Sequence, residues 1–319
     1  MTTKPLPIRL GISQCLLGEA VRYDGGHKRD TFLVDVLGPH VEWVPVCPEV
    51  EAGLGTPREA MRLVGTPEHS RLVTIRSKID HTEAVVQWGA ARVRELEELA
   101  LSGYVFKKDS PSCGIERVRI FNAHGMPAMR GAGLFARAFH AQFPLTPVEE
   151  EGRLCDPALR DNFIERVFAY HRWLCLTEEG LTRQRLIQFH TIHKYLLLAH
   201  SPQHYRMLGS LVAELRGRVL RDVGQRYGAL FMAALSKHAT VRKHVNVLQH
   251  LMGHCRRQLT AAQKRELMDV IDDYHRGMLP LIVPMTLVRH YVRLFEVPYV
   301  RDQVYLNPHP KELMLRNHV

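Results

Sequence analysis

The sequence lacks the features of an exported or zinc-stabilised protein. It has only six cysteines in 319 residues, and none form the close pairs that structural zinc sites use. The thiols are therefore expected to be reduced, as in the cytosol. The longest nearly uncharged apolar stretch, residues 278–288, is short and contains two prolines, so no segment is expected to span a bilayer. The N-terminus has no apolar core of signal-peptide length, and a cytoplasmic location is expected.

Positive charge is concentrated in the second half of the chain. Residues 1–147 contain 18 Lys and Arg against 16 Asp and Glu, whereas residues 148–319 contain 25 against 17. The second half therefore carries most of the formal charge of +10. Such an excess indicates either a solvated surface without a partner or a surface that binds a polyanion such as nucleic acid.

A change in composition at residues 143–152 indicates two domains. This stretch contains two prolines, an acidic run and a glycine, which predicts a linker between domains at 1–147 and 148–319. Before it, β-rich runs alternate with helical spacing, which predicts an α/β domain with a Rossmann-like parallel sheet. The expected strands are 8–13, 41–46, 72–75 and 104–107, and the expected helices are 80–100 and 131–143.

The second half has apolar residues at three-to-four spacing almost throughout, which predicts an all-α helical bundle. An irregular tail rich in Pro, Asn and His is expected at its end, from residue 299. The expected helices are 163–176, 184–199, 205–215, 227–235, 241–252, 261–275 and 285–295.

Three cysteines of the first half, Cys15, Cys47 and Cys113, each follow a predicted strand. Ligands in open α/β sheets bind beyond the carboxyl ends of the strands, so these cysteines can converge on one point. Thiolates are the usual ligands of iron–sulfur clusters, which normally take four, so three cysteines would leave one iron open. The alternative is three unrelated buried cysteines, a common fate for this residue. The surrounding loops favour a site, because they combine glycines with carboxylates and hydroxyls.

Four motifs carry a resemblance to a known family. They are QCLLG at 14–18, RYDG at 22–25, VCPEVEAGLGTPR at 46–58 and KKDSPSCG at 107–114. With these motifs the first half resembles the thiouracil desulfidase (TudS) family. The resemblance implies a [4Fe-4S] cluster on Cys15, Cys47 and Cys113 with one open iron. It also implies an acid–base carboxylate four residues after the second cysteine, here Glu51, and an active-site serine three residues before the third, here Ser110.

These residues are consistent with removal of sulfur from a pyrimidine without net redox change. An open iron can polarise the thiocarbonyl group, Glu51 can deprotonate the attacking water, and Ser110 can donate a hydrogen bond or relay a proton. The sulfur then leaves as hydrosulfide. Glu49 competes with Glu51 for the acid–base role, although it could instead cap the loop. Ser110 could likewise serve only in the turn that precedes Pro111.

The second half is similar to a helical domain of unknown function that is often fused to this family. The similar segments are 237–250, 280–287 and 313–317. The fused form resembles the RudS proteins, which remove sulfur from 4-thiouridine in tRNA. Basic clusters suit contacts with RNA phosphates, with a solvated helix face as the alternative. The expected RNA contacts are Lys237, Arg242, Lys243, Arg256 and Arg257.

The expected function is therefore that of a tRNA 4-thiouridine desulfidase, and two alternatives stay open. One is an enzyme for free thiouracil bases with a structural helical domain. The other is an iron–sulfur protein that binds or senses RNA without catalysis. The positive second half favours the tRNA substrate, because an enzyme for free bases needs no surface for a polyanion. Glu51 and Ser110 beside an open iron favour catalysis over sensing.

Overall fold

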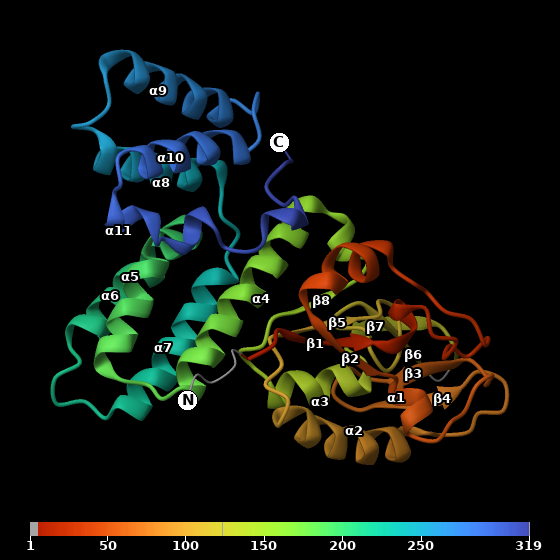
Figure 1. Cartoon of the computed structure of the whole chain (residues 1–319). Helices are drawn as coiled ribbons and strands as arrows, with labels where there is room; N and C mark the ends of the chain where they lie inside the picture. The colour runs from red at the N-terminus through yellow and green to blue at the C-terminus, as the bar shows by residue number, and fades with distance from the viewer. Residues whose placement is uncertain (1–5, 123, 319) are drawn as a thin grey trace. The chain divides into compact units, whose positions relative to one another are not determined.

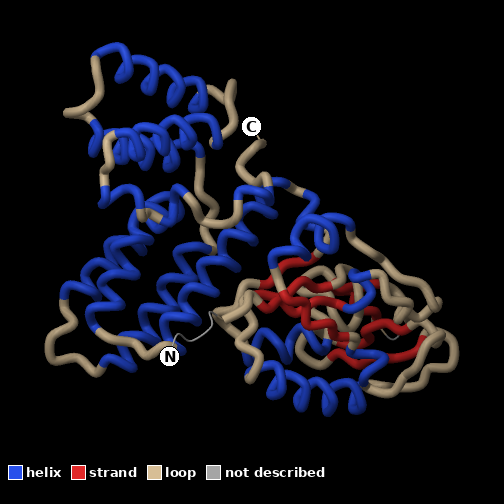
Figure 2. Tube along the Cα trace, in the orientation of Figure 1, coloured by secondary structure: helices blue, strands red, loops and turns tan. Residues whose placement is uncertain are grey.

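The computed structural model of the chain describes residues 6–122 and 124–318. The chain divides into two units, Met1–Leu159 and Arg160–Val319. Among the described residues, every β-strand lies in the first unit, and the second contains only helices and turns (Figures 1 and 2). The expectation of an α/β domain with a parallel sheet, followed by an all-helical region, is confirmed.

The first sheet is fully parallel, with the strand order β2-β1-β5-β8. β5 is buried along its whole length and β1 at all but its first position, as expected for central strands covered on both faces. Helical turns connect β1 to β2. The strands are β1 (Arg9–Ser13), β2 (Glu42–Val46), β5 (Gly103–Phe106) and β8 (Val148–Glu150), and the turns are η1 (Gln14–Leu17), η2 (Phe32–Leu37) and η3 (Gly38–His40).

The first unit also contains a second, mixed sheet that the sequence did not predict. Its order is β4-β3-β6-β7, and only the β3–β6 pair is parallel. The expected strand at 72–75 belongs to this sheet as β4. β7 is exposed at all but its last position, so it lacks the apolar alternation that marks a strand in a sequence. The strands are β3 (Met61–Gly65), β4 (Ser70–Thr74), β6 (Val118–Phe121) and β7 (Pro127–Gly131).

Helices α2 (Thr82–Glu97) and α3 (Leu134–Gln142) pack side by side and cover one face of the parallel sheet (Figure 1). Their buried residues share a core with the aromatic residues of β5. The rings of Tyr104 and Phe106 stack with centroids 4.0 Å apart, and the ring of Phe139 lies 4.8 Å from that of Tyr104. Because aromatic side chains bury large apolar areas, this core fixes the strand from which one of the site loops starts.

The prediction of a linker at 143–152 is wrong for Val148–Glu150. These residues form β8, which pairs in parallel with β5. The acidic run that suggested a solvated linker is buried, because Glu149, Glu150 and Glu151 are 8%, 7% and 8% exposed. Their carboxylates accept hydrogen bonds from within the first unit, which offsets the cost of burying charge. The division between the units therefore falls after Leu159, later than the expected boundary at residue 147.

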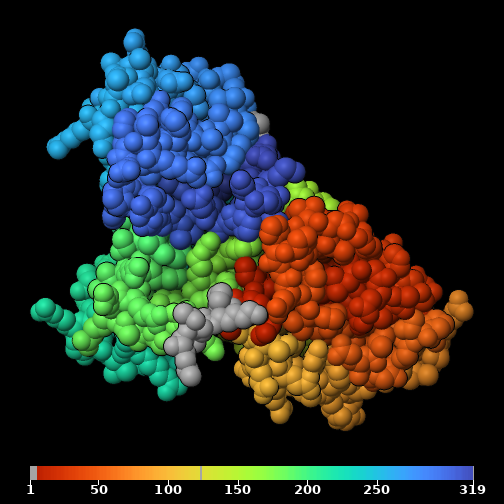
Figure 3. Space-filling view, in the orientation of Figure 1, coloured from red at the N-terminus to blue at the C-terminus, as the bar shows by residue number. Residues whose placement is uncertain are grey.

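The second unit is built of helices at each of the positions expected from the apolar spacing. Helix α5 packs against α6, α7 and α8. Figure 3 shows one face of the chain with the side chains in place. In the described part of the chain no helix is long and apolar enough to cross a membrane. The helices are α4 (Pro157–Glu178), α5 (Arg183–His200), α6 (Pro202–Ala213), α7 (Leu220–Leu235), α8 (Val241–Cys255), α9 (Ala261–His275), α10 (Ile282–Leu294) and the short α11 (Pro298–Arg301).

A cluster of charged side chains is buried inside the second unit. Glu165 of α4 is 4% exposed, and Arg316 of the C-terminal tail is 2% exposed. Nη2 of Arg316 donates to one carboxylate oxygen of Glu165 at 2.9 Å, and Nε2 of His200 lies 3.1 Å from the other. Burial alone would raise the pKa of Glu165, but Arg316 and His200 hold it well below its usual range. The tail, although irregular, is thus tied to α4 by a buried ion pair.

Candidate active site

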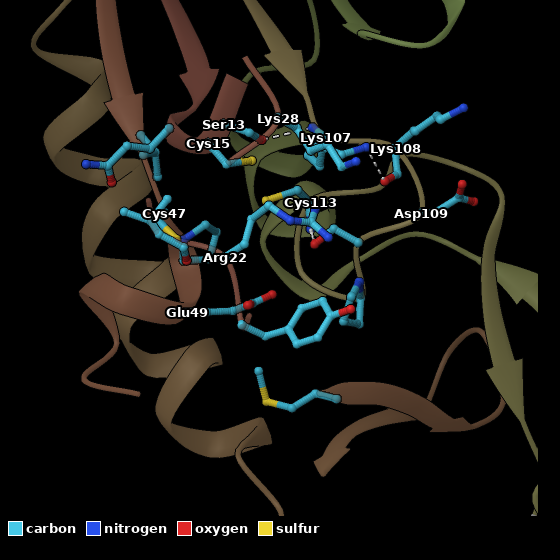
Figure 4. Close-up of a pocket in the computed structure, with 18 of the residues that line it drawn as sticks. Ser13, Cys15, Arg22, Lys28, Cys47, Glu49, Lys107, Lys108, Asp109 and Cys113 are labelled. Atoms are coloured by element: carbon cyan, nitrogen blue, oxygen red, sulfur yellow. Dashed lines mark hydrogen bonds between the residues drawn. The ribbon is translucent and has the colours of Figure 1, made fainter. Parts of the chain in front are cut away.

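Three cysteines meet at one edge of the parallel sheet. Cys15 lies in η1, directly after β1, and Cys47 lies between β2 and helix α1 (Pro48–Glu51). Cys113 lies in the loop that follows β5. Because β2, β1 and β5 are adjacent and parallel, their carboxyl ends lie at the same edge. All three cysteines line one cavity of about 350 Å³, and Figure 4 shows their side chains around it.

The three thiols are buried and free. Cys15, Cys47 and Cys113 are 8%, 9% and 5% exposed, and none of them forms a disulfide. Burial raises the pKa of Cys15 to about 11, and the neighbouring Cys47 adds to the rise. Burial likewise raises the pKa of Cys47 and of Cys113. Such thiols stay protonated at neutral pH, whereas coordination to a metal removes the proton.

The donor set of the cavity fits an iron–sulfur cluster, because three thiols and an excess of basic side chains line it. Among the described residues, no group of three or more His, Cys, Asp or Glu side chains is arranged to hold a metal ion. In an iron–sulfur cluster each cysteine binds its own iron atom, so the sulfurs need not share a point. Basic residues outnumber acidic ones on the wall, which suits the negative charge of thiolates and sulfide. The basic residues are Arg22, Lys28, Arg58, Lys107 and Lys108, and the acidic ones are Glu49 and Asp109.

Glu51 anchors the loop of Cys47 and is not among the described residues that line the cavity. Its Oε1 accepts the backbone N–H of Cys47 at 2.8 Å, and its Oε2 lies 3.3 Å from Nε of Arg92 in α2. Burial raises the pKa of the Glu51 carboxyl. These contacts tie the short helix α1 to α2, so the orientation of Cys47 depends on them.

Glu49 lies on the cavity wall (Figure 4). Its Oε1 accepts a hydrogen bond from the hydroxyl of Ser112 at 2.9 Å, and its Oε2 pairs with Arg58, whose Nε is 3.0 Å away. Both side chains of this ion pair are largely buried, at 13% exposure for Glu49 and 7% for Arg58. Arg58 also donates to the backbone carbonyls of Val21 and Gly55 at 3.1 and 2.8 Å. Through Val21, Arg58 joins the loop after Cys15 to the loop after Cys47.

Ser110 lines the cavity and also stabilises the turn that carries Cys113. Its Oγ accepts the backbone N–H groups of Ser112 at 3.3 Å and of Cys113 at 3.1 Å. The turn role foreseen as an alternative to catalysis is therefore present. A hydroxyl that accepts hydrogen bonds still has its own O–H to donate, so Ser110 can contact a bound ligand as well.

Several residues that shape the site were not predicted. The backbone N–H of Lys107 donates to Oγ of Ser13 at 2.9 Å, which joins the ends of β5 and β1. Glu151 pairs with the side chain of Lys107 and accepts the backbone N–H of Lys108 at 2.7 Å. Glu151 lies in the segment that was expected to be a linker, so its place at the site was not predicted. Arg58 could have been predicted to lie at the site, because it closes the motif that begins beside Cys47.

The basic residues expected to contact RNA lie on the second unit, and one of them has an internal role. Lys243 is half-buried, and its ammonium group donates to the backbone carbonyls of His200 and His238 at 2.7 and 3.3 Å. It therefore caps the carboxyl end of α5. The other four are exposed, namely Lys237, Arg242, Arg256 and Arg257.

Comparison with known proteins identifies both halves of the chain. Residues 10–151 match the family model described as 2-thiouracil desulfurase, and residues 194–310 match a protein family of unknown function, DUF1722. Over 158 residues, 49% of this chain and 94% of its relative, the chain is 35% identical to the uncharacterized protein YbgA of Escherichia coli K12. The chain belongs to the 2-thiouracil desulfurase and DUF1722 families. The resemblance expected from the four cysteine-loop motifs is confirmed.

Two further similarities concern part of the chain. Over 109 residues it is 32% identical to the uncharacterized protein YbbK of Bacillus subtilis 168, which covers 32% of this chain and 71% of that protein. It is also similar to the solved structure of a [4Fe-4S]-dependent thiouracil desulfidase, TudS. That similarity has 32% identity and a TM-score of 0.40, and it covers 48% of this chain and 97% of the other.

Proposed function

We propose that the protein is an iron–sulfur-dependent desulfidase that converts a thiolated pyrimidine and water into the oxygenated pyrimidine and hydrosulfide, with no net redox change. Its proposed physiological substrate is 4-thiouridine in tRNA, which becomes uridine. The proposed cofactor is a [4Fe-4S] cluster held by Cys15, Cys47 and Cys113, with one iron free of protein ligands. The observation that carries the proposal is the convergence of these three buried thiols on one cavity. Membership of the 2-thiouracil desulfurase family supports a thiolated pyrimidine as the substrate.

The chain's own residues would activate water and hold the substrate. When bound, the cluster supplies a Lewis-acidic iron for the thiocarbonyl sulfur. Glu49 is placed to take a proton from the attacking water, because it is the glutamate on the cavity wall. Arg58 and Ser112 fix the direction of its carboxylate. The hydroxyl of Ser110 is placed to donate a hydrogen bond to the pyrimidine ring.

The two glutamates of α1 have different surroundings, which favour different roles. The family resemblance pointed to Glu51 as the acid–base residue, and its position favours another role. Its carboxylate is engaged by the backbone of Cys47 and by Arg92, away from the cavity lining. We therefore assign proton transfer to Glu49 and the positioning of Cys47 to Glu51.

The helical unit supports an RNA substrate through its charge. It carries most of the net positive charge of the chain, and four of the five predicted RNA contacts are exposed. Exposed Lys and Arg bind phosphates with a strength that falls as salt rises. A base in tRNA would have to turn out of its stack to enter a cavity of about 350 Å³.

The function can be tested by anaerobic reconstitution followed by an assay for hydrosulfide. The reconstituted protein should bind about four irons and show the broad visible absorption of a cubane cluster. It should then release hydrosulfide from tRNA that contains 4-thiouridine and, less efficiently, from free 4-thiouracil. Release of hydrosulfide from the free base but not from tRNA would indicate that the helical unit has a structural role. Iron binding without release from either substrate would favour a non-catalytic iron–sulfur protein.

The ligand assignment can be tested with single cysteine variants. Replacement of Cys15, Cys47 or Cys113 by alanine should abolish activity and impair iron retention. The matched control is Cys255→Ala, because Cys255 is also buried, at 2% exposure, and lies in the helical unit. A cluster that survives the loss of Cys113, or that is lost with Cys255, would contradict the assignment.

A further inference from the structure

The hydroxyl of Tyr104 is buried and has no hydrogen-bond partner among the described residues. Tyr104 lies in β5 and is 0% exposed. A buried hydroxyl without a partner destabilises the fold, a cost that phenylalanine at the same place would avoid. Phe106, two residues further along the same strand, packs in the same core without a hydroxyl. The oxygen of Tyr104 therefore needs a reason beyond packing.

The strand beside Tyr104 is also adapted to its ring. Gly11 of β1 is the register partner of Tyr104. A Cβ atom at residue 11 would lie 2.1 Å from Cδ2 of the tyrosine ring, so only glycine fits there without a shift. Glycine in a strand interior is itself unfavourable, because it has no side chain to pack and loses more backbone freedom on folding. Gly11 makes room for the aromatic ring, which phenylalanine would share, so the unpaired hydroxyl is the feature that distinguishes tyrosine here.

The buried core around Tyr104 extends to the cysteine site. Cys113 belongs to the same buried core cluster as Tyr104, and so does Val46, the residue before Cys47. Burial raises the pKa of Tyr104 well above its ordinary value, with further contributions from Cys113, Glu51 and Cys47. The phenol therefore stays protonated and can act only as a neutral donor or acceptor. Protonated thiols accept hydrogen bonds weakly.

We propose that Tyr104 is a positioning residue of the cluster site, whose hydroxyl donates a hydrogen bond to a cysteine thiolate, that of Cys113 or Cys47, once the site is loaded. The inference rests on the proposed function, because coordination to iron is what removes the thiol proton. A hydrogen bond to a charged acceptor is about twice as strong as a neutral one, so loading the site would satisfy the orphaned hydroxyl. Partners of this kind, outside the ligands themselves, tune metal affinity and the reduction potential of iron–sulfur clusters.

The test compares wild type with Tyr104→Phe, each without metal and after anaerobic reconstitution. Without metal, Tyr104→Phe should melt at the same temperature as wild type or higher, because it removes only an unpaired hydroxyl. After reconstitution it should lose iron to an excess of chelator about tenfold faster or more. The midpoint potential of its cluster should also be lower, because one donor to a thiolate sulfur has gone.

The matched control is Tyr227→Phe in the helical unit. Tyr227 is also 0% exposed, but its hydroxyl lies 3.1 Å from Nδ1 of His190. This variant should lower the melting temperature and leave iron retention and potential unchanged. Equal iron loss and equal potential in Tyr104→Phe and wild type would contradict the role of Tyr104 and leave the proposed function standing. A lower melting temperature of metal-free Tyr104→Phe would also overturn it, by showing that the hydroxyl already has a partner. Failure of wild type to take up iron would overturn the proposed function as well.

Discussion

Glu51 accepts the backbone N–H of Cys47 at 2.8 Å, and this contact turns its carboxylate away from the cavity that Glu49 lines. Two glutamates separated by one residue thus point to different neighbours. Glu49 reaches Arg58 and Ser112, and Glu51 reaches α2 through Arg92. The difference allows proton transfer and cysteine positioning to be separated by mutation.

The first prediction concerns these two glutamates. Glu49→Gln should lower the rate of hydrosulfide release by about 10²–10⁴-fold while iron content stays near that of wild type, because the amide cannot accept the proton of the attacking water. Glu51→Gln should keep a larger share of the rate but lose iron faster, because it weakens the support of Cys47. The measurements are turnover per cluster and iron content after gel filtration. An inactive Glu51→Gln beside an active Glu49→Gln would restore the acid–base role to Glu51.

The second prediction separates two adjacent basic residues of α8. Arg242→Glu should weaken tRNA binding and reduce the slope of log affinity against log salt by about one unit, because fewer counterions are released. It should leave the melting temperature almost unchanged, since exposed charges contribute little to folding. Lys243→Met should instead lower the melting temperature, because the last carbonyl of α5 loses its partner. The checks are tRNA affinity across a salt series and thermal unfolding. Unchanged affinity and slope in Arg242→Glu would exclude Arg242 from the RNA contact.

The third prediction is a loss of stability of the helical unit in mild acid. Burial lowers the pKa of His190 to about 4 and those of His193 and His244 to about 3. Their unfolded value is about 6.5, so below that pH the unfolded state binds protons that the folded state excludes. The stability is therefore complete above about pH 6.5 and is lost as pH falls toward 4, by roughly 1.4 kcal/mol per pH unit for each histidine.

Thermal unfolding of the metal-free protein between pH 7 and about 5.5 tests this prediction. The lower limit stays about one pH unit above the pKa of unfolded glutamate, so carboxylates such as Glu165 take up few protons in this range. His193→Phe should make the melting temperature depend less on pH. Phenylalanine keeps an aromatic ring to stack on Phe189, but it cannot bind a proton. A wild-type melting temperature that is constant over this range would contradict the burial of neutral histidines.

The fourth prediction concerns where the first unit can be cut. A fragment ending at Leu159 keeps β8 and Glu151, so it should fold, bind iron and desulfurise free 4-thiouracil. A fragment ending at residue 147 loses the strand that pairs with β5 and the partner of Lys107, and it should be less stable and retain less iron. Circular dichroism melting and iron content compare the two. If the longer fragment also processes tRNA as well as the full chain does, the helical unit does not recruit RNA.

Much of the fold could be predicted because its strongest elements have strong periodicity. The strands β1, β2 and β5 and the long helices carry apolar residues at the spacing of their secondary structure. The second sheet was not predicted, because short strands such as the exposed β7 have no such apolar pattern. The buried glutamates before Gly152 resembled a solvated linker, because their partners come from distant loops that only the folded chain brings near.

The convergence of the three cysteines on one cavity could be predicted, whereas the placement of Glu49 and Glu51 relative to it could not. Cys15, Cys47 and Cys113 follow strands, and topology rules bring the ends of parallel strands together. The choice between Glu49 and Glu51 depends on how one short helix turns against α2, which motif spacing does not encode. Tyr104 gave no signal at all, because an aromatic residue in a buried strand looks like ordinary core.

The three cysteines are far apart in the chain, yet they stand at the ends of three neighbouring strands. A group that needs all three can be held only after β2 and β5 have both paired with β1, and these pairings are non-local and slow to form. Iron uptake would therefore follow folding and could not precede it. Bound iron per chain would then report the fraction of molecules with the correct topology, and chains that pair their strands wrongly would remain colourless.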